Sequence, residues 1–198
     1  MESDSTEPDG GTPFDGEGLL LTNIRTRDQL FIAEARNISK AALKYLAAVP
    51  SERSAPFTLD WSYRLHREMF GDVWEWAGKK RTTQKNIGVP ANQIDSGLKD
   101  LFDDLAAWRE HKSYSSIEQA ARLHHRAVSI HPFNNGNGRW SRLLADIHLK
   151  QSGSQPTMWL ENINTDESAA RKEYIAALKA ADKSDYSKLI RLHEKYSR

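Results

Sequence analysis

Apolar residues recur at intervals of three and four positions along most of this 198-residue chain, which is the spacing of one face of an amphipathic helix. The pattern predicts a series of helices separated by more polar stretches. They cover residues 26–50, 58–71, 96–108, 116–130, 139–153, 166–181 and 185–196. We therefore expect an all-α fold, built as a helical bundle.

Several residues mark the ends of these helices. Thr26 and Gln29 have the spacing of a capping box, and Thr58 and Ser96 are candidate N-caps because a hydroxyl oxygen can accept the N–H groups of a first turn. Gly153 is a candidate stop, since glycine readily adopts the left-handed conformation that ends helices.

Two stretches break the helical pattern. Residues 1–18 are acidic and rich in Gly and Pro, which favours a flexible N-terminal arm, and the remainder, 19–198, is expected to form one domain. Residues 81–96 read RTTQKNIGVPANQIDS, where Thr and aliphatic residues surround Gly88. This composition predicts a short β-hairpin or extended flap over about residues 81–91.

Composition narrows the class of protein. Hydrophobic residues make up 38% and charged residues 28%, enough for one sizeable core. The formal net charge is only +1 and no basic block is present, so direct nucleic-acid binding is not expected. No apolar run has the length of a membrane span, the first residues do not resemble a signal peptide, and there is no Cys. We therefore expect a cytoplasmic protein that does not bind membranes and has no disulfide or thiolate metal site.

Residues 131–142 read HPFNNGNGRWSR and stand between two predicted helices. A loop with Gly136, Asn137 and Gly138 directly before a helix can point several backbone N–H groups at one anion. Arg139 and Arg142 follow on neighbouring positions of the first turn, where forked guanidinium donors suit phosphate oxygens. The alternative is a glycine-rich turn with two solvated arginines, but all five residues together favour a polyphosphate site.

The histidines differ in what they suggest. His131 begins this loop and is its only side chain able to accept a proton near neutral pH, so it is a candidate general base. Phe133 is expected to anchor the loop to the core. His124 and His125 point in different directions on a helix and do not form a metal site; His124 is expected to lie in the core and to hydrogen-bond the following loop.

The stretch HPFNNGNGRWSR resembles the signature of Fic proteins, His-x-Phe-x-Asp/Glu-Gly-Asn-Gly/Lys-Arg-x-x-Arg. The upstream stretch LHREMFGDVWEWAGKKRTTQKNIGV and the later YIAALKAADKSDYSKLIRL are also similar to segments of that family, so the resemblance covers roughly residues 58–196. It implies a Fic-type helical bundle with a flap over the active site. It also implies transfer of AMP from ATP to a Ser, Thr or Tyr hydroxyl of a target protein, with release of pyrophosphate.

The resemblance implies roles for individual residues. His131 would be the general base, the loop from Gly136 to Gly138 would hold the α- and β-phosphates, and Arg139 and Arg142 would bind the phosphate tail. The flap residues implied to dock an extended segment of the target are Lys85, Asn86, Ile87, Gly88 and Val89.

Asn135 departs from the motif, because most Fic proteins have an acid there that holds Mg²⁺. An amide oxygen can ligate a hard cation but adds no charge, so Mg²⁺ would bind mainly through phosphate oxygens and water. Two further functions therefore stay open. One is a nucleotide-binding regulatory or toxin-antitoxin-like module with weak or no turnover, and the other is transfer of a different phosphate-containing group.

The sequence TTQKNIGV and the Asn before Gly-Asn-Gly are similar to the branch called mobile mystery protein B, which implies a helix-turn-helix partner protein. A homodimer is left open. Residues 157–162, TMWLEN, match the string of the inhibitory helix found in many Fic proteins. We reject this match, because the surrounding stretch contains Pro and is predicted to connect helices.

Overall fold

The computed structural model describes residues 16–159 and 168–197, and within them the chain is helical. Seven α-helices and one short 3₁₀ helix are present in the described residues. Their bounds are α1 Arg27–Leu46, α2 Leu59–Phe70, η1 Ala91–Gln93, α3 Ile94–His111, α4 Ser116–Ile130, α5 Asn137–Gln151, α6 Ala169–Ala181 and α7 Ser187–Tyr196. The predicted all-α fold is confirmed.

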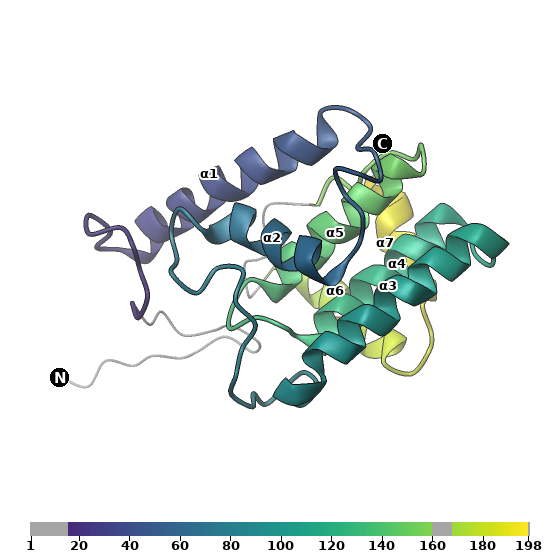
Figure 1. The fold of residues 1–198 in the computed structure, drawn as a ribbon. Coiled ribbons are helices and arrows are strands. Elements are labelled where there is room, and N and C mark those ends of the chain that lie inside the picture. Colours follow the sequence, from purple (N-terminus) through teal and green to yellow (C-terminus); the bar gives the residue numbers. More distant parts are fainter. Residues whose placement is uncertain (1–15, 160–167, 198) are drawn as a thin grey trace.

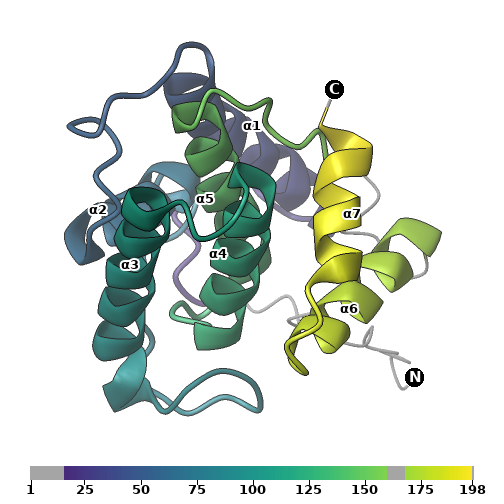
Figure 2. The same ribbon diagram turned by 90° about the vertical axis from the view of Figure 1, so that its right-hand side faces the viewer.

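Helix α5 occupies the centre of the molecule (Figure 1) and packs against α4, α1 and α2. Helix α4 lies between α3 on one side and the pair of α6 and α7 on the other (Figure 2). The polar loop at 131–136 joins α4 to α5. Since both helices are largely buried, the loop is anchored to the core at both ends.

Most of the predicted helix ends are confirmed. Thr26 and Gln29 form the expected capping box on α1, and the Thr58 hydroxyl accepts the N–H of Trp61 at the start of α2. The prediction for Ser96 is wrong, because α3 begins at Ile94, directly after η1. The Ser96 hydroxyl donates back to the Gln93 carbonyl at 3.1 Å, as Ser does inside a helix.

The main hydrophobic core includes residues from α1 to α5, and a second cluster joins α4 to α6 and α7. His124 is fully buried in this second region, as predicted. Its partners are not in the following loop, however: Nε2 lies 2.9 Å from the Tyr174 hydroxyl and Nδ1 lies 3.3 Å from His193 Nε2. His193 Nδ1 in turn lies 2.6 Å from the Thr157 hydroxyl, so polar contacts link α4, α6, α7 and residue 157.

Other predictions fall partly outside the described residues. The arm at 1–18 is described only for its last three residues, which turn into an isolated bridge between Leu19 and Trp74. The string at 157–162 is described only up to Trp159. None of the described helices has the combined length and apolarity that crossing a membrane requires.

Candidate functional site

The loop between α4 and α5 turns sharply at both ends. His131 ends α4 in the left-handed region with φ 53°, and Gly136 caps α5 with φ 79°. A Cβ atom at position 136 would lie 2.6 Å from Cζ of Phe70, so only glycine fits there. The loop therefore brings the end of α4, with its histidine, to the N-terminus of α5, where first-turn N–H groups lack partners within the helix.

Asn137 fixes the shape of this loop. Its side-chain Oδ1 accepts the N–H of Phe133 at 2.9 Å, and its Nδ2 donates to the Phe133 carbonyl at the same distance. The side chain is 3% exposed. Its amide group is thus bonded within the loop, and the Gly136 N–H is bonded to Asn135 Oδ1, so the backbone N–H groups of Asn137 and Gly138 are the part of the predicted nest that can face an anion.

His66 on α2 packs against the loop and bonds to it, and this residue was not identified from the sequence. Its ring stacks on Phe133, the predicted anchor, at 3.6 Å between centroids. Its Nδ1 accepts the N–H of Gly78 at 2.9 Å, so Nε2 carries the proton and donates to the Asn135 carbonyl at 3.1 Å. Burial lowers the pKa of His66 to about 3, which keeps the ring neutral and this pattern fixed at physiological pH.

Arg139 lies at the start of α5 and forms an ion pair with Glu34 of α1. The same carboxylate accepts the indole N–H of Trp74 at 2.7 Å, and the guanidinium lies 4.8 Å from the Phe70 ring centroid. Glu34 is buried on the inner face of α1. The sequence signal for it was a single acid in register with Leu30, Ala41 and Tyr45, and sequence reasoning missed it.

Arg142 points to a different part of the molecule. It is 6% exposed, and its guanidinium carbon lies 5.5 Å from the Tyr174 ring centroid and 6.0 Å from that of Trp159. Burial lowers its pKa, and the positive charge of Arg139 adds to the effect. Arg139 and Arg142 were expected on adjoining positions of the helix, and they do lie one turn apart. Their contacts differ, however, because Arg139 pairs with Glu34 of α1, whereas Arg142 lies against the aromatic rings of Tyr174 and Trp159.

His131 is the candidate base. Burial lowers its pKa to about 4, helped by the positive charges of Arg81 and Lys85. The buried Nδ1 atom has no hydrogen bond to the described residues. The backbone of Val128 opposes the lowering and raises the pKa in part. At neutral pH the imidazole is therefore uncharged and able to accept a proton.

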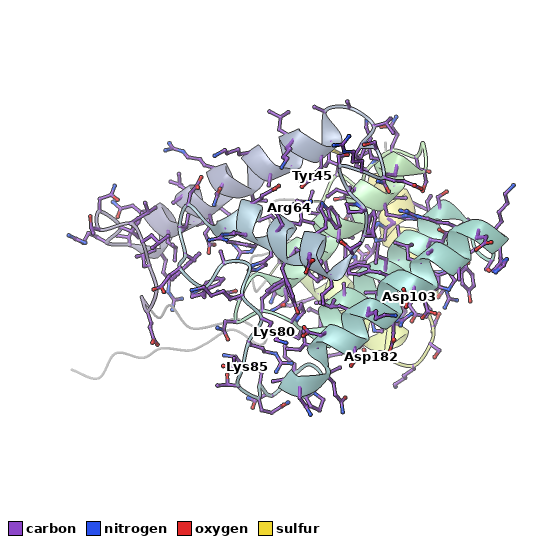
Figure 3. All side chains as sticks on the ribbon, in the orientation of Figure 1. Tyr45, Arg64, Lys80, Lys85, Asp103 and Asp182 are labelled. Carbon is purple, nitrogen blue, oxygen red and sulfur yellow. The ribbon has the colours of Figure 1, made fainter. Side chains whose placement is uncertain are left out.

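Of the two alternatives predicted for residues 81–91, the β-hairpin is wrong, because these residues form no strand. Residues 82–88 of the flap are an exposed loop with bends, and Lys85 lies on it (Figure 3). The ladder bonds of a hairpin are replaced by contacts to the segment 130–133: Arg81 donates its N–H to the Pro132 carbonyl at 2.9 Å, and Val89 donates to the Ile130 carbonyl at 3.3 Å. Lys80 bridges to Phe133 just before the flap.

Metal ligands are scarce around the loop. The Asn135 Oδ1 atom accepts the N–H of Gly136 at 2.6 Å, and the carboxylate of Glu34 is paired with Arg139. Among the residues that the structure describes, no three His, Cys, Asp or Glu side chains gather into a metal site. These residues do not fit a magnesium centre held by protein carboxylates.

Comparison with known proteins gives consistent matches. Residues 56–149 match the model of the Fic/DOC family. The chain is 32% identical over 163 residues to the protein adenylyltransferase fic-1 of Caenorhabditis briggsae, covering 79% of this chain and 31% of that protein. It is 29% identical over 124 residues to the uridine 5'-monophosphate transferase of Xanthomonas campestris, covering 54% of this chain and 23% of that protein.

Among solved structures, Fic-1 from C. elegans superimposes with a TM-score of 0.69 and 28% identity, over 91% of this chain and 52% of that chain. The chain spans about a third of the length of the first curated relatives that it matches. The matched region contains the helices α2 to α5 almost entirely and the loop that joins α4 to α5. The chain therefore carries a domain of the Fic/DOC family.

Proposed function

We propose that the chain is a protein adenylyltransferase that moves AMP from ATP to a Ser, Thr or Tyr hydroxyl of a target protein. The observation that carries the proposal is that a loop of five residues, 132–136, joins His131, at the end of α4, to the N-terminus of α5, where first-turn N–H groups can bind phosphate. The names of relatives in the same family support this reaction class.

The reaction divides into parts that these residues can perform. His131 accepts the hydroxyl proton while the hydroxyl oxygen forms a bond to the α-phosphorus of ATP. The bond from that phosphorus to the bridging oxygen of the β-phosphate breaks, and pyrophosphate leaves. The N–H groups of Asn137 and Gly138 and the guanidinium of Arg139 stabilise the charge that moves onto the phosphate oxygens, whereas the Gly136 N–H stays bonded to Asn135 Oδ1.

Asn135 supplies a neutral amide at the position where the family motif has an acid. In the proposal, any Mg²⁺ comes with ATP and is held by phosphate oxygens and water. Arg142 binds the phosphate tail, and the flap residues 85–89 receive the target. The helix-turn-helix partner stays a prediction from the resemblance to the mobile mystery protein B branch, and a homodimer stays open.

Mass spectrometry after incubation with ATP and Mg²⁺, alone and with host lysate, tests the proposal. We expect an adenylyl adduct that disappears in His131→Ala and persists in His111→Ala, which changes an exposed histidine at the end of α3. An adduct that survives in His131→Ala would remove this histidine from the chemistry.

The uridine 5'-monophosphate transferase among the relatives favours one alternative donor, so UTP is included in the same experiment. If a uridylyl adduct forms in preference to an adenylyl adduct, the donor is UTP and not ATP, and the roles proposed for the residues stay the same. ATP binding without any adduct would favour the regulatory module.

A further inference from the structure

Arg81 is the most deeply buried part of the flap. The residues from Thr82 to Gly88 are exposed, whereas Arg81 is 1% exposed and ranks among the largest fully buried side chains in the described part of the chain. Its side-chain hydrogen bonds within the described residues go to backbone carbonyls and not to a carboxylate, although a buried charge without compensation is costly.

Three backbone carbonyls provide these contacts. The Nε atom of Arg81 donates to the His131 carbonyl at 2.7 Å, and Nη1 donates to the Thr83 carbonyl at 3.0 Å. Nη2 donates to the Val89 carbonyl. One planar guanidinium thus bonds to both arms of the flap and to the backbone of the candidate base.

Gly88 shows how closely these parts approach. Its φ is +96°, and a Cβ atom there would lie 2.6 Å from His131 Cβ and 2.8 Å from Arg81 Nη2. The flap therefore touches both the histidine and the arginine at one point. Because the flap has no ladder of its own, these contacts set its geometry.

We propose that Arg81 is a positioning residue that holds the two arms of the flap and the backbone of His131 in one fixed arrangement. The role in catalysis rests on the proposed adenylyl transfer. Under that reaction, a target segment that docks on the flap places its hydroxyl at a fixed distance from the base. Loss of Arg81 should then slow transfer and leave nucleotide binding unchanged, since Arg81 does not contact the nest.

Trypsin cleavage after Lys85 reports on the flap without reference to catalysis. Lys85 is exposed on the flap (Figure 3), and cleavage requires the loop to open. Arg81→Met removes hydrogen bonds from a charged donor, so cleavage there should become faster by about tenfold or more. Arg64→Met, which removes a half-exposed arginine on α2 with only a 4.0 Å contact to Glu68, is the matched control and should leave the rate unchanged.

Arg81→Lys separates charge from geometry. Lysine keeps the positive charge but lacks a planar fork that can reach three carbonyls. We expect faster cleavage after Lys85 in both Arg81 variants. Titration of the His131 ring by NMR should show a pKa that rises toward 6.5 in Arg81→Met and changes less in Arg81→Lys. If Arg81 had only a structural role, the pKa of the His131 ring would change by the same amount in both variants.

Transfer is measured as the rate of His131-dependent adduct formation with ATP and host lysate, and ATP affinity by calorimetry. We expect both Arg81 variants to lose about tenfold or more in rate while the Kd for ATP changes by less than about twofold. Faster flap cleavage with an unchanged transfer rate would overturn the proposal. So would unchanged cleavage in a folded Arg81→Met.

Two outcomes need separate treatment. If Arg81→Met does not fold, as judged by its circular dichroism and melting, Arg81→Lys decides the same question. If the wild-type protein forms no adduct with any donor, the proposed transferase activity is refuted. The cleavage and titration results still decide whether Arg81 holds the flap to His131.

Discussion

Glu34→Gln tests whether α1 competes with phosphate for Arg139. The substitution keeps the size of the side chain and an oxygen that can accept the Trp74 indole N–H. It removes the charge that pairs with Arg139, where the side chains are only 9% and 20% exposed. Hydrogen bonds to charged groups contribute about 1.5–3 kcal/mol and neutral ones about 0.5–1.5 kcal/mol. The free energy of unfolding should therefore fall by about 1.5 kcal/mol.

The same difference should appear with the opposite sign in ATP binding. If Arg139 must leave Glu34 to reach the phosphates, the wild-type protein loses the ion pair on binding and the variant does not. A free-energy gain of about 1.4 kcal/mol corresponds to a tenfold lower Kd. Urea unfolding and calorimetry with ATP measure the two quantities on the same preparation.

Asp103→Asn provides the control. It breaks the ion pair between Asp103 and Lys99, which lies on α3 and away from the pair of Glu34 and Arg139 on α1 and α5 (Figure 3). The Asp103 side chain is 64% exposed. Such surface pairs contribute about 0–1 kcal/mol, so stability should change little and ATP affinity should not change. If Glu34→Gln lowers stability but leaves ATP affinity as it was, Arg139 does not exchange Glu34 for phosphate, and the reasoning is refuted.

Three further predictions address the loop and its support. Arg142→Ala should weaken binding of ATP by about 2 kcal/mol more than binding of AMP in calorimetry, and equal losses would mean that Arg142 does not contact the phosphate tail. Asn135→Asp should speed transfer at low Mg²⁺ and weaken ATP binding without metal; no change in either would place Asn135 away from the metal. Burial lowers the pKa values of His66 and His193 to about 3, below the value of about 6.5 for the unfolded chain. The unfolded state therefore binds more protons between these values, and stability, complete above pH 6.5, should fall as pH falls toward 3, by up to about 1.4 kcal/mol per pH unit for each histidine. Urea unfolding over this pH range checks it, and a flat profile would contradict the burial of these rings.

Local features of the sequence predicted the helices well, because their signals lie within a few residues of each other. Thr26 and Thr58 cap α1 and α2 through N–H groups three positions away. Ser96 misled the same reasoning, since the 3₁₀ turn after Pro90 had already started the helix. The hairpin prediction failed for a different reason: Arg81 takes the flap carbonyls that a second strand would otherwise have used.

The partners of the site could not be predicted in this way. Glu34 and Arg139 are 105 residues apart, and no local spacing relates them. His66 lies 69 residues before the Asn135 carbonyl that it supports. Such pairs are set by how α1 and α2 pack on α5, which depends on the whole core. The motif at 131–142 marked the candidate loop, whereas local spacing could not predict Glu34 and Tyr174, which contact its two arginines.

The placement of those partners has a consequence for how the site can diverge. The family model matches residues 56–149, but Glu34 precedes that range and Tyr174 follows it. The two guanidinium groups repel one another, and each is held by a segment outside the matched region. Under the proposed function, exchange of α1 or α6 between relatives would change how tightly the two arginines bind phosphate without any change in the sequence of the shared motif. Two proteins with identical loops would then differ in nucleotide selectivity because of the helices that flank them.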